Sequence, residues 1–374
     1  MTRAFRIGRI FGIDIEVDYT WFIIFFLVAA ALSTGLKTWG LRDLPLMTKW
    51  LVAAFATLLF FASVLIHELS HSVVAMRHGL GIAGITLFLF GGVSKMLDEP
   101  KSPGDEFRIS VAGPATSMVL AAIFLGLAFV ARRAPGGDVF NPVFTWLAAM
   151  NGMLAIFNLL PGFPLDGGRV LRAGLWRGLG NLAEATRIAS TFGHALGILM
   201  IVGGILLFLL GGGGGALWLS LIGWFLTQAA QSSYQQVVLR QALLGVPVSA
   251  AMTQEVQWIP ADITLDQVVH EFVMMYNHPA FPVMDNGQLL GLLCVNDVRA
   301  VPREQWGYVT ARQVVPPLSE ANSIAPHTDA WDTLVKMTAD NCGRLMVVED
   351  GRLLGIISRT DIMRLMKMRM ELGV

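Results

Sequence analysis

Long apolar stretches constrain this chain more than any other feature. Six of them have about the length that crosses the roughly 30 Å hydrocarbon core of a bilayer as a helix. They are residues 19–35, 51–76, 107–131, 144–160, 188–210 and 216–232. Charged residues are 14% of the chain, whereas soluble domains carry about 25%. The sequence therefore predicts a polytopic α-helical membrane protein with about six transmembrane helices.

The distribution of Arg and Lys predicts the orientation. With the N-terminus inside, the predicted inner segments hold eleven of these residues and the outer segments five. An even number of spans places the C-terminus inside too. The N-terminal segment lacks the pattern of a cleaved signal peptide. We therefore expect a multi-pass protein of the cell membrane with both termini cytoplasmic, and an outer glycine loop at 211–215 that acts as a spacer.

Charge and cysteine content exclude two further classes. Lys and Arg number 27 and Asp and Glu number 27, so there is no basic surplus and we expect no nucleic-acid partner. The two cysteines, Cys294 and Cys342, predict neither a disulfide framework nor a thiolate metal site. They indicate a reducing compartment for the C-terminal third.

Residues 80–103 contain too many glycines for a helix. The run "ITLFLF" favours a strand, and Gly91-Gly92 follows it. Non-helical backbone at membrane depth is tolerated only where protein or a wet cavity covers it. We therefore expect a re-entrant or interfacial β-hairpin beside the second span.

The second apolar stretch contains the motif His67-Glu68-Leu69-Ser70-His71. Residues i and i+4 share a helix face, so both imidazoles can reach one metal ion. Glu68 projects about 100° around from His67, beside that ion. In this motif the histidines bind zinc and the Glu is a general base. Ionisable groups inside a membrane are functional candidates; the alternative is a pair of buried histidines satisfied by hydrogen bonds between helices.

A catalytic zinc has three protein ligands and one open position. His78 shares a face with His67 but lies seven residues beyond His71, about 10 Å along the axis. It is expected to be a solvated residue at a helix end. Asp166 follows two prolines that break the fourth span and precedes two glycines. It is the predicted third ligand; the alternative is an N-cap for the basic helix that follows.

An internal repeat occupies the C-terminal third. "FPVMDNGQLLGLLCVNDV" (281–298) aligns with "LMVVEDGRLLGIISRTDI" (345–362). Each copy predicts strand, helix, strand, tight turn, strand and helix. This resembles a tandem pair of CBS domains, the α/β Bateman module. The expected domains are a membrane domain at 1–240 and CBS repeats at 246–305 and 306–374.

The motif at 67–71 together with N-x-x-P-x-x-P-x-D-G at 158–167 resembles the site-2 protease family of intramembrane zinc metalloproteases, peptidase family M50, in its CBS-bearing prokaryotic branch. The resemblance implies one Zn²⁺ per chain and regulated intramembrane proteolysis of a membrane-tethered regulator, such as an anti-sigma factor or a latent transcription factor. It also implies that His67, His71 and Asp166 are the zinc ligands and that Glu68 is the general base. Asn158 would donate a hydrogen bond to the substrate backbone or to the oxyanion. Gly91, Gly92 and Val93 would form the substrate-binding stretch, to which an unwound substrate segment would add as a strand.

CBS pairs commonly bind adenine nucleotides through the pattern G-h-h-[ST]-x-x-D, and they often dimerise. The second repeat keeps the pattern with Ser358 and Asp361, whereas the first has Cys294 before Asp297. A thiol is a weaker hydrogen-bond donor than a hydroxyl. We therefore expect one nucleotide site, at Ser358 and Asp361; the alternative is a purely structural dimerisation module.

Two other functions are compatible with the motifs. A CBS-gated transporter or channel would use the His/Glu/Asp cluster as a metal or proton relay, and its ligands would be spread along a path. A metal-binding pseudo-enzyme would lack the Glu, but Glu68 is present. The convergence of the predicted ligands at one depth favours the protease.

Overall fold

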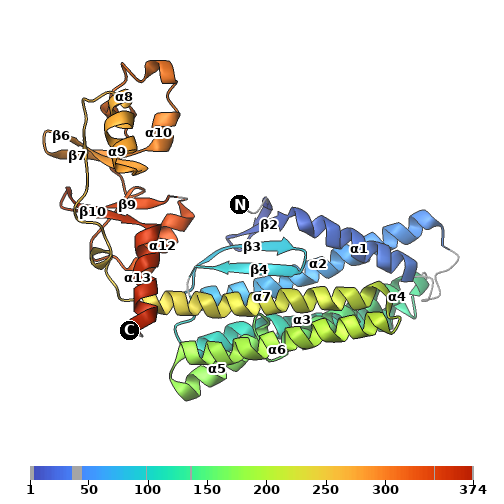
Figure 1. Cartoon of the computed structure of the whole chain (residues 1–374). Coiled ribbons are helices and arrows are strands. Elements are labelled where there is room, and N and C mark those ends of the chain that lie inside the picture. The colour runs from blue at the N-terminus through green and yellow to red at the C-terminus, as the bar shows by residue number, and fades with distance from the viewer. Residues whose placement is uncertain (1–3, 36–43, 98, 135–136, 341, 373–374) are drawn as a thin grey trace. The chain divides into compact units, whose positions relative to one another are not determined.

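Figure 1 shows a computed structural model of the chain, which describes residues 4–35, 44–97, 99–134, 137–340 and 342–372. Contacts within it divide the chain into two compact units, residues 1–235 and 236–374. Three residues of the charge count, Arg3, Lys37 and Arg42, lie outside the described part.

Every predicted apolar stretch forms a helix, and a further helix, α5, follows the fourth. The helices are α1 (Tyr19–Gly35), α2 (Leu46–Arg77), α3 (Pro103–Ala131), α4 (Gly137–Asn158), α5 (Asp166–Leu179), α6 (Leu182–Leu209) and α7 (Gly213–Leu243). Among the described helices, α2, α3, α4 and α6 are long and apolar enough to cross a membrane, and α1 is an apolar helix of 17 residues. A polytopic helical membrane domain is thereby confirmed, and the count of six spans stays a prediction.

A four-stranded sheet accompanies these helices. Its strands, in spatial order, are β1 (Ala4–Ile10), β2 (Ile13–Asp18), β3 (Ile82–Phe88) and β4 (Gly91–Met96). The hairpin expected within 80–103 is β3–β4; its depth in a membrane stays a prediction. The strands β1 and β2 were not foreseen, although residues of β2 alternate between buried and half-buried. Parallel pairing of β2 with β3 joins the two hairpins.

The sheet packs on α2 at the level of the histidine motif. Ile85 belongs to the same buried cluster as Leu69, and Leu87 to the same buried cluster as Val64, so the two clusters flank His67 along α2. Full burial of such side chains contributes roughly 1.5–3 kcal/mol each. This packing sets β4, which is an edge strand of the sheet, along the part of α2 that carries the motif.

The predicted glycine loop is shorter than expected. Helix α7 already begins at Gly213, so only part of 211–215 forms the connection. Glycines also face the neighbouring helix: an ideal Cβ on Gly204 would lie 2.6 Å from the carbonyl oxygen of Ala216, and one on Gly197 would lie 2.7 Å from that of Gly223. Small residues of this kind let membrane helices approach closely, so glycine serves packing as well as the turn.

The second unit contains two similar halves. The first has β5 (Ile259–Pro260), α8 (Leu265–Gln267), a π-helix (Val268–Val273), α9 (Met274–Tyr276), β6 (Ala280–Asp285), β7 (Gln288–Cys294), α10 (Val295–Arg299) and α11 (Ala311–Val314). The second has β8 (Ser323–Ile324), α12 (Ala330–Ala339), β9 (Arg344–Glu349), β10 (Arg352–Ser358) and α13 (Arg359–Leu372). Apart from two short 3₁₀ helices (Val248–Ala250 and Arg303–Gln305) and from α11, which follows α10 in the first half, the order of elements repeats as predicted. The central hairpin of each half turns at Asn286-Gly287 or Asp350-Gly351 with positive φ.

Candidate metal centre

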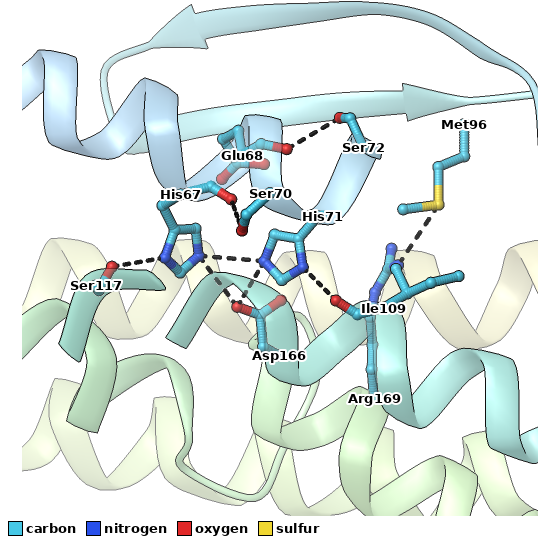
Figure 2. A network of polar contacts seen from close by, with 10 residues as sticks. All are labelled: His67, Glu68, Ser70, His71, Ser72, Met96, Ile109, Ser117, Asp166 and Arg169. Carbon is cyan, nitrogen blue, oxygen red and sulfur yellow. Dashed lines mark hydrogen bonds and ion pairs between the residues drawn. The ribbon is translucent and has the colours of Figure 1, made fainter. Parts of the chain in front are cut away.

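Three side-chain atoms converge between α2 and α5 (Figure 2): Nε2 of His67, Nε2 of His71 and Oδ2 of Asp166. The two nitrogens are 3.2 Å apart, and the carboxylate oxygen lies 3.2 Å from His67 and 3.1 Å from His71. A tetrahedral zinc site with bonds of about 2.0 Å has ligand-to-ligand edges of about 3.3 Å. The triangle therefore has the size of one face of such a site.

The hydrogen bond that Nδ1 of each imidazole makes bears on whether its Nε2, on the inner side, carries a hydrogen. Nδ1 of His71 lies 2.6 Å from the carbonyl oxygen of Ile109, which can only accept, so Nδ1 carries the hydrogen. In the neutral ring, Nε2 of His71 is then an acceptor aimed at the Asp166 carboxylate. Nδ1 of His67 lies 2.9 Å from Oγ of Ser117. Hydrogen bonds between helices thus hold both outer nitrogens and leave the two Nε2 atoms facing the Asp166 carboxylate. Two imidazole nitrogens and one carboxylate oxygen form a donor set that fits zinc.

Helix α3 leaves room for that cation because residue 113 is glycine. An ideal Cβ on Gly113 would lie 2.1 Å from Nε2 of His71 and 2.6 Å from Nε2 of His67. Any side chain would fill the space between the imidazoles. Sequence reasoning missed Gly113 and Ser117; the only signal was a run of small residues in "VAGPATS".

Asp166 is the first residue of α5 and not its N-cap, which is Leu165 and makes no side-chain capping bond. The two glycines after Asp166 let the preceding loop fold back on the helix. A Cβ on Gly167 would lie 2.3 Å from the carbonyl oxygen of Leu159, and one on Gly168 would meet the backbone of Gly162 at the same distance. This close approach directs the carboxylate of Asp166 toward the imidazoles.

Glu68 lies outside the ligand group, on the side of α2 that faces the β3–β4 hairpin (Figure 2). An ideal Cβ on Gly92 would lie 2.5 Å from Cγ of Glu68. One turn further along α2, Oγ of Ser72 lies 2.9 Å from Oγ of Ser94. Strand β4 therefore passes directly beside Glu68, and glycine at position 92 makes that possible.

Two further residues considered from the sequence lie apart from the triangle. Asn158 is the half-buried last residue of α4, and its side chain makes no hydrogen bond with the described residues. His78 caps the end of α2, and its Nδ1 lies 2.9 Å from Oδ1 of Asp105. This contact with α3 therefore holds His78 at the helix end.

The second unit contains a cavity of about 260 Å³ between its two halves, whose lining includes His278, Arg344, Ser358 and Asp361. Oγ of Ser358 donates to Oδ2 of Asp361 at 2.5 Å. In the first half the backbone N–H of Cys294 donates to Asp297 at 2.8 Å, and neither residue lines this cavity. Burial raises the pKa of the Cys294 thiol, so it stays protonated at neutral pH.

Comparison with known proteins agrees with this architecture. Residues 55–136 and 133–201 match Peptidase family M50, and residues 248–304 and 311–368 match the CBS domain. Rip3 of Mycobacterium tuberculosis is 35% identical over 367 residues, which cover 98% of this chain and 93% of Rip3. Zinc metalloprotease MJ0392 of Methanocaldococcus jannaschii is 31% identical over 366 residues, covering 98% and 97%. The solved Site-2 Protease from Methanocaldococcus jannaschii is 33% identical, with a TM-score of 0.43, and covers 62% of this chain and 95% of that chain.

The chain therefore belongs to peptidase family M50 and is a metalloprotease of the zinc-dependent kind. Within that family it belongs with the site-2 proteases that carry a C-terminal pair of CBS domains. The family resemblance read from the two motifs is confirmed.

Proposed function

We propose that this protein is an intramembrane zinc metalloprotease that hydrolyses peptide bonds within or near transmembrane segments of membrane-tethered regulatory proteins. The observation that carries the proposal is the triangle of acceptor atoms beside Glu68, on a helix that is long and apolar enough to span a bilayer. The substrates would be regulators of the anti-sigma or tethered transcription-factor type. The enzyme would lie in the cell membrane with both termini in the cytoplasm.

His67, His71 and Asp166 would hold one zinc ion, since their three atoms have the spacing and the lone pairs that such an ion needs. Bound zinc supplies a Lewis acid that strengthens water as a nucleophile and polarises the scissile carbonyl. Ile109 and Ser117 keep the two rings aimed inward by bonding their Nδ1 atoms. Such orienting bonds are a usual feature of metal-ligating histidines.

Glu68 would act as the general base. Its carboxylate takes a proton from the attacking water and later delivers it to the nitrogen of the leaving amine. A carboxylate that ligated the metal would be less available for this transfer, and Glu68 lies beside the ligand group and not in it.

The substrate would bind as an extended segment, because a helix hides its carbonyl groups in its own hydrogen bonds. Strand β4 is an edge of the sheet and begins with Gly91, Gly92 and Val93 next to Glu68. An unwound substrate segment can add to such an edge as a further strand. The amide of Asn158, at the end of α4, would then donate to the substrate backbone or to the developing oxyanion.

We further infer that the CBS pair binds an adenine nucleotide and dimerises. Ser358 and Asp361 would hold the ribose, while His278 and Arg344 in the same cavity offer cationic or donor groups to phosphate. Such a ligand can change proteolysis only insofar as it binds two states of the enzyme differently.

The variant Glu68→Gln tests the proteolytic function. It should lower hydrolysis of a single-span peptide by about 10²–10⁴-fold, the usual contribution of a general base, with the zinc content unchanged. Glu184→Gln is the matched control, because the Glu184 side chain is 40% exposed and pairs with Arg187 on α6. Cleavage by Glu68→Gln at a rate near that of the wild type would refute the assignment. Membrane fragments that the wild type releases and Glu68→Gln does not would identify the substrates.

A further inference from the structure

A buried ion pair joins α3 to α5, away from the ligand triangle. Nε of Arg172 donates to Oε1 of Glu106 at 2.6 Å, and Nη2 contacts the same oxygen. Glu106 is 1% exposed and Arg172 is 5% exposed. Burying two charges costs several kcal/mol per ion before their attraction is counted. A pair of hydrophobic residues would fill this space at lower cost, so the pair calls for a function.

Arg172 also contacts the segment that leads to Asp166. Its guanidinium carbon lies 5.0 Å from the centre of the Phe163 ring, within the range of a cation–π contact. Phe163 is buried in the loop just before Asp166, and its N–H donates to the carbonyl oxygen of Ala189 on α6 at 3.2 Å. Arg172 thus contacts α3 and the loop that sets the start of α5.

The two helices contribute different parts of the metal centre. Helix α3 orients both imidazoles, through the carbonyl of Ile109 and the hydroxyl of Ser117. Helix α5 supplies Asp166. Glu106 lies three residues before Ile109, and Arg172 lies six residues after Asp166, about 9 Å along the helix axis.

We propose that Glu106 and Arg172 are positioning residues of the metal centre. Their ion pair sets the spacing between the helix that orients the two histidines and the helix that carries the carboxylate, and it thereby sets the affinity for zinc. The proposal rests on the ligand set of the proposed function. It does not depend on which peptide the enzyme cleaves.

The second carboxylate oxygen of Glu106 allows an effect of the ion pair on stability to be separated from its effect on helix spacing. Oε2 has no hydrogen-bond partner within the part of the chain that the structure describes. Removing Arg172 alone therefore leaves a poorly compensated buried charge, whereas removing both groups restores an uncharged interior. Stability should recover in the double variant, but the defined spacing of the helices should not.

The test uses the full-length protein with Glu106→Gln, Arg172→Lys and the double variant Glu106→Leu/Arg172→Met. Zinc affinity is measured by competition with a chelator of known affinity, using zinc alone, and thermal unfolding of the metal-free form is followed in parallel. Each variant should bind zinc about 10–100-fold more weakly, the range seen when the groups that orient metal ligands are disturbed. Arg172→Lys keeps the charge but loses the planar fork, so its shift should be the smallest. Hydrolysis should return when zinc is in excess.

Glu184→Gln, which breaks an exposed ion pair of the same type, should leave zinc affinity unchanged. Wild-type zinc affinity in the folded variants, with lower stability alone, would overturn the proposal and make the pair purely structural. Recovery of zinc affinity together with stability in the double variant would overturn it as well. A chain that binds zinc as expected but cleaves no peptide would refute the proposed function and leave this inference standing.

Discussion

Gly113 of α3 lies so close to His71 of α2 that an ideal Cβ on the glycine would be 2.1 Å from Nε2 of the histidine. Real atoms that are not bonded do not approach this closely. The space that the missing side chain leaves open lies between the imidazoles, where we expect the metal. A single methyl group at position 113 therefore competes with zinc.

Gly113→Ala should abolish zinc binding, with less than about one tenth of an equivalent remaining by elemental analysis of the purified protein. The control is Gly126→Ala on the same helix, where a Cβ would meet no atom within 4 Å. That change should keep full zinc and, since alanine is the better helix former, raise stability by up to about 1 kcal/mol. Full zinc occupancy in Gly113→Ala would contradict the location of the metal.

Asp166→Ala should lower the zinc content as much as His71→Ala does, because each removes one of the three predicted ligands. His78→Ala should keep the zinc, since His78 pairs with Asp105 at the end of α2. Metal analysis of the three purified variants decides the matter. An equivalent of tightly bound zinc in Asp166→Ala would require another third ligand.

Gly92→Ala should slow hydrolysis while zinc stays bound. The new methyl group would lie 2.5 Å from Cγ of Glu68 and would displace its carboxylate. Misplacing a catalytic group by about 1 Å can cost on the order of 10²-fold in rate. Gly8→Ala in β1, where a Cβ meets no atom within 4 Å, is the control. An unchanged rate in Gly92→Ala would mean that Glu68 works from another position.

The CBS pair should bind AMP, ADP or ATP with heat measurable by calorimetry of the full-length protein. Asp361→Ala should weaken binding by about 10–100-fold, the equivalent of one hydrogen bond to a charged group. Asp297→Ala should change it little, because Asp297 lies outside the lining of the cavity that contains Ser358 and Asp361. Equal binding by wild type and Asp361→Ala would contradict the assignment of the nucleotide to this cavity.

Topology can be read from reporter fusions. Fusions after residues 134 and 212 should report the outer side, and a fusion after residue 245 should report the cytoplasm. The last position tests α4 and α7, the helices formed by the two shortest of the later stretches. An outer signal after residue 245 would mean that one of them does not cross the bilayer.

Much of the molecule could be predicted from sequence because its signals are local. Spacing of four residues on a helix brings His67 and His71 to one face. The prolines before Asp166 and the glycines after it predicted this residue as the third ligand, and the structure places it beside His67 and His71. The two halves of the second unit were visible as a repeat, because the two copies can be aligned with each other within one sequence.

Only the tertiary structure decided what surrounds these residues. The carbonyl of Ile109 that orients His71 is 38 residues away, Ser117 lies 50 residues from His67, and Arg172 lies 66 residues from Glu106. The sequence does not indicate which backbone carbonyl will accept a hydrogen bond or which glycine will face another helix. It also does not indicate which residue will pair with a given charged side chain. These contacts depend on how closely whole helices pack against one another. Many side chains together set that distance, so no single motif in the sequence predicts it.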